Sequence, residues 1–168
     1  LGALLGMGAP NEMLNAAGFS DSPHLFFSGY DDKGDWFQLF QIGFGGVPGR
    51  PIGDGPDGHS LWPSFTNVPN EFVEAYFPLR VETYEFIVDS GGAGLHRGGN
   101  GLSVAYRFLV DGHIGIHDDR WLTYPWGVNG GKPGKRSTKL LVRADGTEEH
   151  VPAKCEGVKV SKGDLLYF

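Results

Sequence analysis

The chain has 168 residues and a net charge of −6, and it contains 28 Gly and 11 Pro, the two residues that most often interrupt regular structure. Because Gly and Pro cost about 1 and about 3 kcal/mol in a helix interior, this composition excludes a helical bundle or a coiled coil. The hydrophobic content of 40% excludes a disordered linker. The acidic balance argues against nucleic acid or an anionic membrane as the main partner. A turn-rich, β-rich globular chain remains.

Cysteine usage and length limit the compartment and the domain count. The single cysteine, Cys155, excludes an internal disulfide and a Cys-based zinc site, and it fits a reducing compartment. No secretory signal and no apolar run long enough to span a bilayer stands out, so we expect a cytoplasmic location. The length fits one domain over 1–168. Because the chain begins at Leu1 and stops at Phe168 within an apolar run, we expect a portion of a longer protein.

The first third of the chain predicts a helix, a strand and a long loop. Residues 1–17 are the best helix candidate, although three glycines interrupt the pattern. Residues 35–44 predict a strand that carries large apolar side chains on one face, namely Trp36, Phe40, Ile42 and Phe44. Residues 43–58 have Gly or Pro at about every second position, and this pattern predicts a loop.

The middle of the chain predicts one short helix and three strands. Residues 70–77 form a helix-like segment after Pro69, and residues 79–89 form a strand. Residues 102–110 alternate cleanly, and the inward positions are Leu102, Val104, Tyr106, Phe108 and Val110. In the strand at 112–118, two isoleucines oppose two histidines, namely Ile114 and Ile116 against His113 and His117.

Two hairpins are expected toward the end of the chain. Residues 139–151 fold back at Asp145-Gly146, a pair typical of a type I′ turn. Residues 158–168 form a second hairpin around Lys162-Gly163-Asp164. Together the elements predict an α+β, β-rich fold of antiparallel strands and hairpins with Gly/Pro-rich loops and few short helices.

The segment Asp89–Gly101 has six glycines among its thirteen residues. Glycine lets backbone N–H groups approach a ligand, so one interpretation is a loop that holds a carboxylate or phosphate, with Arg97 adding a two-pronged donor. The alternative is a wide hairpin whose glycines only relieve crowding, with Asp89 pairing Arg97. The segment matches neither a Walker A motif nor a dinucleotide fingerprint, and residues 135–138 also miss the P-loop spacing.

Three further groups of polar residues could carry chemistry. In the loop 53–59, Asp54, Asp57 and His59 could bind a divalent metal or perform acid–base chemistry, although Asp-Gly pairs also form ordinary Asx-turns. The run 117–120, beginning at His117, could supply a ligand or a base, or it could be a salt-bridge network at a strand end. Glu71 and Glu74 share one helix face and could be an acid–base pair or solvated charges.

Several of these segments, taken in order, resemble the hydantoinase B/oxoprolinase family. The matching segments are Asn70-Glu71-Phe72-Val73-Glu74, Pro78-Leu79-Arg80-Val81-Glu82, Asp89-Ser90-Gly91-Gly92-Ala93-Gly94, Arg97-Gly98-Gly99-Asn100-Gly101, Pro125-Trp126-Gly127, Gly130-Gly131-Lys132-Pro133-Gly134 and Lys162-Gly163-Asp164. The resemblance covers most of the chain from about residue 45 onward, and the Asp-Ser-Gly-Gly segment is the most specific part of it.

The resemblance implies a role in an ATP-dependent enzyme that opens cyclic amides such as hydantoins or 5-oxoproline. The chain would be the C-terminal portion of a hydantoinase B-type subunit that works with a hydantoinase A-type partner. The partner would bind ATP, and a divalent metal would lie outside this portion. Asp89 and Arg97 are the candidate catalytic residues near the substrate or the subunit interface, and His59 and Asp57 are further candidates for the pocket, followed by His117.

Three alternatives stay open from the sequence. Relatives of the family are subunits of acetone and acetophenone carboxylases, so the chain could belong to an ATP-dependent ketone carboxylase. It could also be a non-catalytic module that completes such a complex, because its many aromatic residues would leave apolar patches if it were alone. A free-standing carbohydrate- or anion-binding β domain fits the composition but has no motif behind it.

Overall fold

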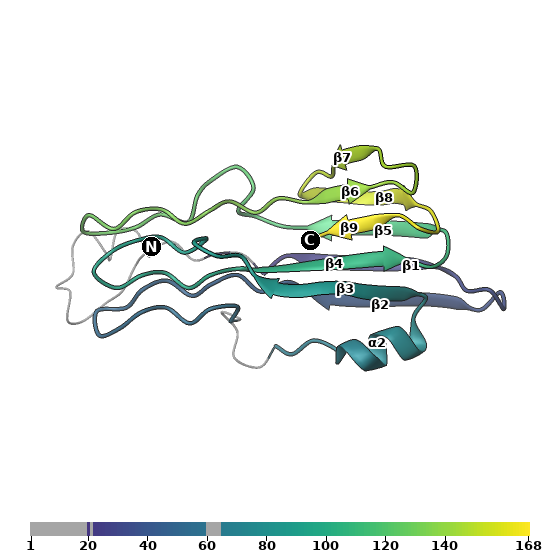
Figure 1. Ribbon diagram of the computed structural model, residues 1–168, viewed down its shortest axis with the longest axis horizontal. Coiled ribbons are helices and arrows are strands. Elements are labelled where there is room, and N and C mark those ends of the chain that lie inside the picture. Colours follow the sequence, from purple (N-terminus) through teal and green to yellow (C-terminus); the bar gives the residue numbers. More distant parts are fainter. Residues whose placement is uncertain (1–19, 21, 60–64) are drawn as a thin grey trace.

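The computed structural model describes residues 20, 22–59 and 65–168, and these residues form two antiparallel sheets (Figure 1). The predicted helix at 1–17 lies outside the described residues. The first sheet has four strands in the order β2-β1-β5-β8. Its strands are β1 (His24–Tyr30), β2 (Trp36–Ile42), β5 (Gly112–His117) and β8 (Lys154–Val160).

The second sheet has five strands in the order β3-β4-β9-β6-β7. Its strands are β3 (Leu79–Phe86), β4 (Leu102–Phe108), β6 (Leu140–Val142), β7 (Glu148–His150) and β9 (Leu165–Tyr167). The helix α2 (Asn70–Tyr76) contacts β3 and buries Val73 completely, and Glu74 of this helix accepts a hydrogen bond from the Val81 backbone at 2.8 Å. The β-rich α+β class and the short helix predicted at 70–77 are confirmed.

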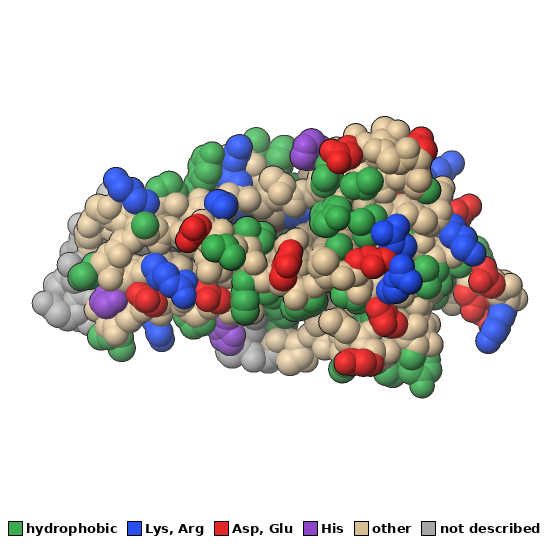
Figure 2. Space-filling model, viewed as in Figure 1, with side chains coloured by type: hydrophobic (Ala, Val, Ile, Leu, Met, Phe, Trp, Pro, Cys, Tyr) green, Lys and Arg blue, Asp and Glu red, His purple; other side chains and the backbone are tan. Residues whose placement is uncertain are grey.

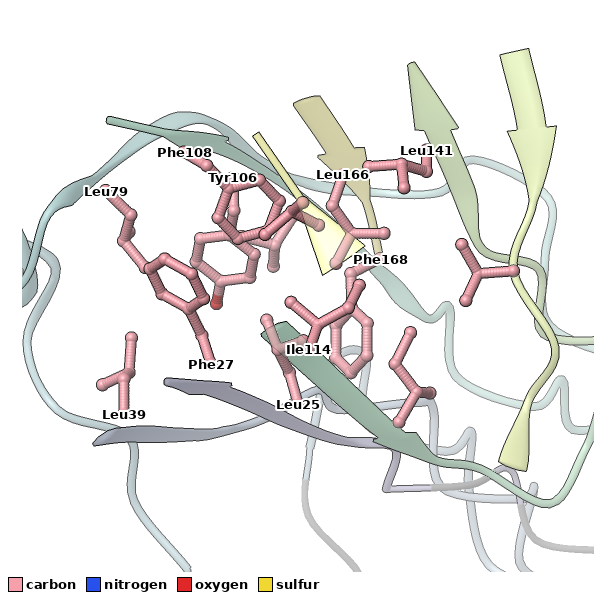
Figure 3. Close-up of a cluster of buried hydrophobic side chains, with 14 of the residues drawn as sticks. Leu25, Phe27, Leu39, Leu79, Tyr106, Phe108, Ile114, Leu141, Leu166 and Phe168 are labelled. Carbon is pink, nitrogen blue, oxygen red and sulfur yellow. The ribbon is translucent and has the colours of Figure 1, made fainter. Parts of the chain in front are cut away.

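The hydrophobic core lies between the two sheets (Figure 3). Phe27 of β1 packs against Phe108 of β4, and their ring centroids are 4.7 Å apart. The alternation along β4 places Val104, Tyr106 and Phe108 in this core, as predicted. Since each fully buried large apolar side chain contributes about 1.5–3 kcal/mol, this layer is the main source of the fold's stability.

The apolar side chains predicted on one face of 35–44 differ in burial, because Trp36 and Phe40 are exposed while Ile42 is buried, and Leu39 of the opposite face joins the core. One sequence expectation on local geometry is wrong. The turn at Asp145-Gly146 is not type I′, because only Gly146, at φ 87°, has the positive φ that both positions of that turn require. The Gly146 backbone N–H donates to the Arg143 carbonyl, and Arg143 and Thr147 pair across the turn.

The hairpin expected at 158–168 is also wrong, because β8 and β9 belong to different sheets. The turn at Gly163, with φ 95°, carries the chain from one sheet to the other. The adjacent Asp164 is buried, and its carboxylate accepts hydrogen bonds from the Ser161 and Ala144 backbones and from the Arg143 side chain. This buried carboxylate therefore fixes the crossing between the sheets.

The strands and the long loops occupy opposite halves of the molecule (Figure 1). The loops that follow β2, β3 and β5 all extend from the same end of the sandwich, drawn on the left. This placement brings together three segments that are far apart in the sequence, residues 43–58, 87–101 and 118–139. The functional candidates of the sequence are concentrated in these loops. Among the described residues, no helix is long and apolar enough to cross a membrane.

Candidate functional site at the loop end of the sandwich

The first two loops pack backbone against backbone at their glycines. A Cβ atom added at Gly46 would lie 1.8 Å from the Gly99 carbonyl oxygen, and one added at Gly99 would lie 1.9 Å from the Pro56 carbonyl oxygen. Hydrogen bonds hold these segments together, from the Gly99 N–H to the Val47 carbonyl (2.8 Å) and from the Val47 N–H to the Pro56 carbonyl (3.0 Å). Only glycine permits such close approach of two backbones.

The third loop joins this stack at the start of the Gly-rich segment. A Cβ atom at Gly92 would lie 2.2 Å from the Lys132 carbonyl oxygen, and the Lys132 N–H donates to the Ala93 carbonyl at 2.7 Å. The Lys135 N–H donates to the Ser90 carbonyl at 2.8 Å. Within 89–101 the positive φ falls on Asp89, at 56°, and on none of the glycines. Relief of crowding therefore accounts for Gly92 and Gly99, which face the backbone of other loops, and for Gly91 and Gly98, which face backbone atoms across their own loop.

Arg97 and Asp57 form an ion pair that connects the first two loops. The two guanidinium nitrogens donate to the two carboxylate oxygens at 2.7 and 3.2 Å, and the Asn100 N–H donates to the same carboxylate at 2.7 Å. These hydrogen bonds, the one from Arg97 first, hold the pKa of Asp57 below its usual value, and Asp57 raises the pKa of Arg97. The Arg97 N–H also donates to Asp54 at 3.0 Å.

The structure thus brings two of the four candidate catalytic residues together and leaves the other two apart. The expected pairing of Arg97 with Asp89 is wrong, because the partner of Arg97 is Asp57. Asp89 is exposed at the start of its loop, and the exposed His59 donates its backbone N–H to the Gly45 carbonyl at 3.0 Å. Among the described residues, no three His, Cys, Asp or Glu side chains gather where they could hold a metal ion.

The run from His117 to Arg120 forms a network of ion pairs at the end of β5, as one of the two interpretations predicted. His117 contacts Glu156 at 2.5 Å, and Asp119 contacts Lys154 at 2.8 Å. Between them Asp118 pairs with Lys139, and both side chains are fully buried. The buried pair anchors the end of the third loop to the end of β5.

A cavity of about 560 Å³ lies among the three loops, the start of β4 and the C-terminal end of β9. Its volume is in the range of small-molecule sites. The ionisable residues that line it are five cations and one histidine, namely Arg120, Lys132, Lys135, Arg136, Lys139 and His96. No Asp or Glu is among its described lining residues. Phe44, Tyr124 and Trp126 contribute apolar wall.

The sequence candidates and the cavity do not coincide. Asp89, Arg97, His59 and Asp57 are not among the described lining residues, and their catalytic roles stay predictions. Sequence reasoning missed the cationic segment Lys132–Arg136 as a site. Its signal is present in the sequence, since three cations fall within five residues of an otherwise acidic chain. Comparison with the P-loop motif could not reveal this site, because the segment packs on the loop 87–101 and is not followed by a helix.

Comparisons with known proteins agree with this fold. A family model described as hydantoinase B/oxoprolinase matches residues 2–168. A protein of Pseudomonas sp. (strain NS671), whose name describes it as the B component of a D-/L-hydantoinase, is 30% identical over 90% of this chain. The chain spans 26% of the length of that relative.

Two solved structures share the fold over 97% of the chain. An ATP-dependent caprolactamase from Pseudomonas jessenii superposes with a TM-score of 0.75 at 17% identity, over 30% of its own chain. A nucleotide-free acetone carboxylase superposes with a TM-score of 0.72 at 16% identity, over 26% of its own chain. Because the family model covers nearly every residue, the chain belongs to the hydantoinase B/oxoprolinase family.

Proposed function

We propose that this chain is part of the catalytic subunit of an ATP-dependent cyclic-amide hydrolase and that the subunit works with a hydantoinase A-type partner that uses ATP. The observation that carries the proposal is the family match over residues 2–168 together with the fold shared with an ATP-dependent caprolactamase. In this reaction the C–N bond of the ring breaks, a carboxylate forms at the carbon, and the nitrogen takes up a proton. Two water molecules are consumed in total, one for opening the ring and one for converting ATP to ADP and phosphate.

The described residues fit the recognition of a small molecule better than the binding of a metal or nucleotide. They offer no three-residue donor set for a metal, and the segment 134–138 lacks P-loop spacing. We propose that ATP binds to the hydantoinase A-type partner and that any divalent metal is held outside this portion of the subunit. We propose that the ion pair of Arg97 and Asp57, 2.7 Å between nitrogen and oxygen, holds the loops 43–58 and 87–101 in position beside the cavity.

A second candidate is a subunit of an ATP-dependent ketone carboxylase. The TM-score of 0.72 with acetone carboxylase, close to the 0.75 with the caprolactamase, favours it. Both candidates use ATP to activate an oxygen of the substrate, so the same scaffold serves either chemistry. They differ in the second substrate, which is water in one case and bicarbonate in the other.

The test is a substrate panel on the full-length subunit co-purified with its partner. ADP release is measured with hydantoins, 5-oxoproline and a lactam, and then with acetone or acetophenone with and without bicarbonate. The proposal predicts ADP release with a cyclic amide and a matching amount of ring-opened product. Bicarbonate-dependent ADP release with a ketone alone would replace it with the carboxylase. An assembly that consumes no ATP with any of these substrates would favour the interpretation of the chain as a non-catalytic module.

A further inference from the structure

The cavity at the loop end is far more positive than the chain that encloses it. The chain carries 14 Lys and Arg against 20 Asp and Glu, yet the described lining residues include five Lys or Arg and no Asp or Glu. A wall of one sign concentrates the electrostatic field inside a hollow with apolar surroundings. Such a field favours an anion.

Three of these cations have no carboxylate partner among the described residues. Lys132 and Lys135 are exposed and form no ion pair there, and Lys135 donates only to the Val88 carbonyl at 3.4 Å. Arg136 stacks over the Tyr124 ring, 4.9 Å from its centroid, and donates to the Leu122 carbonyl at 3.5 Å. Within the part of the chain that the structure describes, no carboxylate neutralises their charge.

Several arginines in the body of the sandwich do have carboxylate partners. Arg80 and Arg107 share Glu82, and Arg143 contacts both Glu149 and Asp164. Even Lys139, at the inner end of the cavity, has its charge balanced by the buried Asp118. On the described wall of the cavity, Lys132, Lys135 and Arg136 therefore carry charge that no described carboxylate balances. In Figure 2, Lys and Arg side chains and apolar side chains occupy the upper edge of the loop half, where the segment Lys132–Arg136 runs in Figure 1.

The rest of the wall is apolar or backbone. The guanidinium carbon of Arg120 lies 5.0 Å from the centroid of the Trp126 ring, over its face. Phe44 and Phe168 add further aromatic surface. A bare inorganic ion would leave this surface uncovered. A molecule with an apolar body and one charged end would cover it.

We propose that this cavity binds a small molecule that carries an oxyanion, either a carboxylate or a phosphate, on an apolar body, and that Lys132, Lys135 and Arg136 hold the oxyanion. This site rests on the proposed function for the choice of ligand. Opening a cyclic amide creates a carboxylate, and the use of ATP releases phosphate. Guanidinium and ammonium groups are the usual donors to both anions.

The experiment measures binding by isothermal titration calorimetry with the full-length subunit in complex with its partner. The probes are N-carbamoylphenylalanine, its neutral primary amide and inorganic phosphate. The test variant is the triple substitution K132Q/K135Q/R136Q. The matched control is K33Q/K159Q/K162Q, which removes the same charge at three exposed lysines that do not line the cavity.

We expect the carboxylate to bind at least about tenfold more tightly than its amide, and the test variant to lose at least about tenfold in affinity, while the control stays within about twofold. Phosphate binding with the same dependence would assign the site to a phosphoryl group; carboxylate binding alone would assign it to the ring-opened product. Equal affinity for acid and amide, or an equal loss in both triple variants, would overturn the proposal. Binding is measured without turnover, so the two proposals can fail separately. A complex that hydrolyses cyclic amides but binds no anion in this cavity would refute the anion site and leave the proposed function standing.

Discussion

Replacement of Gly99 by Ala tests whether the loops at the functional end are held by contact between backbones. The new Cβ atom would lie 1.9 Å from the Pro56 carbonyl oxygen and 2.5 Å from its carbon, whereas side-chain carbons in proteins keep about 3 Å. Backbone must therefore move by about 1 Å. Overpacking of this kind costs about 1–3 kcal/mol, and the lower entropy of the unfolded Ala chain offsets about 0.4–1 kcal/mol. We expect a net loss of about 1.3 kcal/mol in loop stability.

The assay is hydrogen–deuterium exchange of the full-length subunit, followed at peptides that contain Val47, Gly55 and Gly99. The Gly55 and Gly99 N–H groups donate between the two loops, to the Arg97 and Val47 carbonyls, and the Val47 N–H donates within the first loop to the Pro56 carbonyl that the new Cβ atom would displace. A loss of about 1.3 kcal/mol predicts roughly ninefold faster exchange of these N–H groups when local opening governs the exchange.

The matched control is Gly94→Ala in the same loop. A Cβ atom there would meet nothing closer than the His96 carbonyl oxygen at 3.3 Å, and Gly94 has no positive φ. We expect its exchange to change by less than about threefold, since a contact of this length needs a shift of only a few tenths of an ångström. Equal exchange in Gly99→Ala and wild type would refute the close packing of the loops.

Three further predictions concern side chains. Arg97→Ala is expected to lower turnover far more than stability, because an exposed ion pair contributes only about 0–1 kcal/mol to folding, whereas this one positions two loops beside the cavity. Asp164→Ala is expected to lower the free energy of unfolding by about 3 kcal/mol in urea titrations, because it leaves three donors around a buried position without their acceptor. Burial, with a contribution from nearby His117, lowers the pKa of His24, so the folded state binds fewer protons than the unfolded state near pH 6. Stability from His24 is therefore fully present above its unfolded pKa of about 6.5 and declines as pH falls through the lower folded pKa, and urea midpoints between pH 8 and pH 5 will show it.

Each of these has its own control. Arg80→Ala removes another exposed ion pair, at a site outside the cavity, and equal effects of the two arginine variants on turnover would show that Arg97 has no special role. Asp145→Ala removes an exposed acceptor and should cost under about 1 kcal/mol; a similar loss at Asp164 would contradict its role between the sheets. In His24→Gln the acid-side decline should be smaller, and an unchanged slope would rule out His24 as its source.

The strands could be predicted from the sequence where alternation and burial coincide. In β4 and β5 the predicted inward residues Val104, Tyr106, Phe108, Ile114 and Ile116 are buried, although Ala105 and Gly115 between them are buried as well and Leu102 is only half-buried. β2 has large apolar residues on both faces, so the period alone could not tell which face meets the core. The pairing of β9 depends on partners distant in the sequence, and a local turn signal at Gly163 suggested a hairpin that tertiary packing replaces by a crossing between sheets.

The site was harder to predict than the fold for the same reason. Arg97 and Asp57 are each candidates from the sequence, but a separation of 40 residues hides their pairing. The glycines of 89–101 left an anion-binding backbone and relief of crowding both open, and close approach of other backbone atoms accounts for Gly91, Gly92 and Gly99. The cations that line the cavity lie on a loop that reaches it only after β5 and β6 have been placed in different sheets.

The most direct test of the central claim is native mass spectrometry of the protein from its natural source, with peptide identification of each component. The account predicts that this sequence is found in an assembly that contains an ATP-using hydantoinase A-type subunit. The same preparation should release ADP when a cyclic amide is added. A stable, unaccompanied chain of 18.2 kDa without ATP-dependent activity would contradict it.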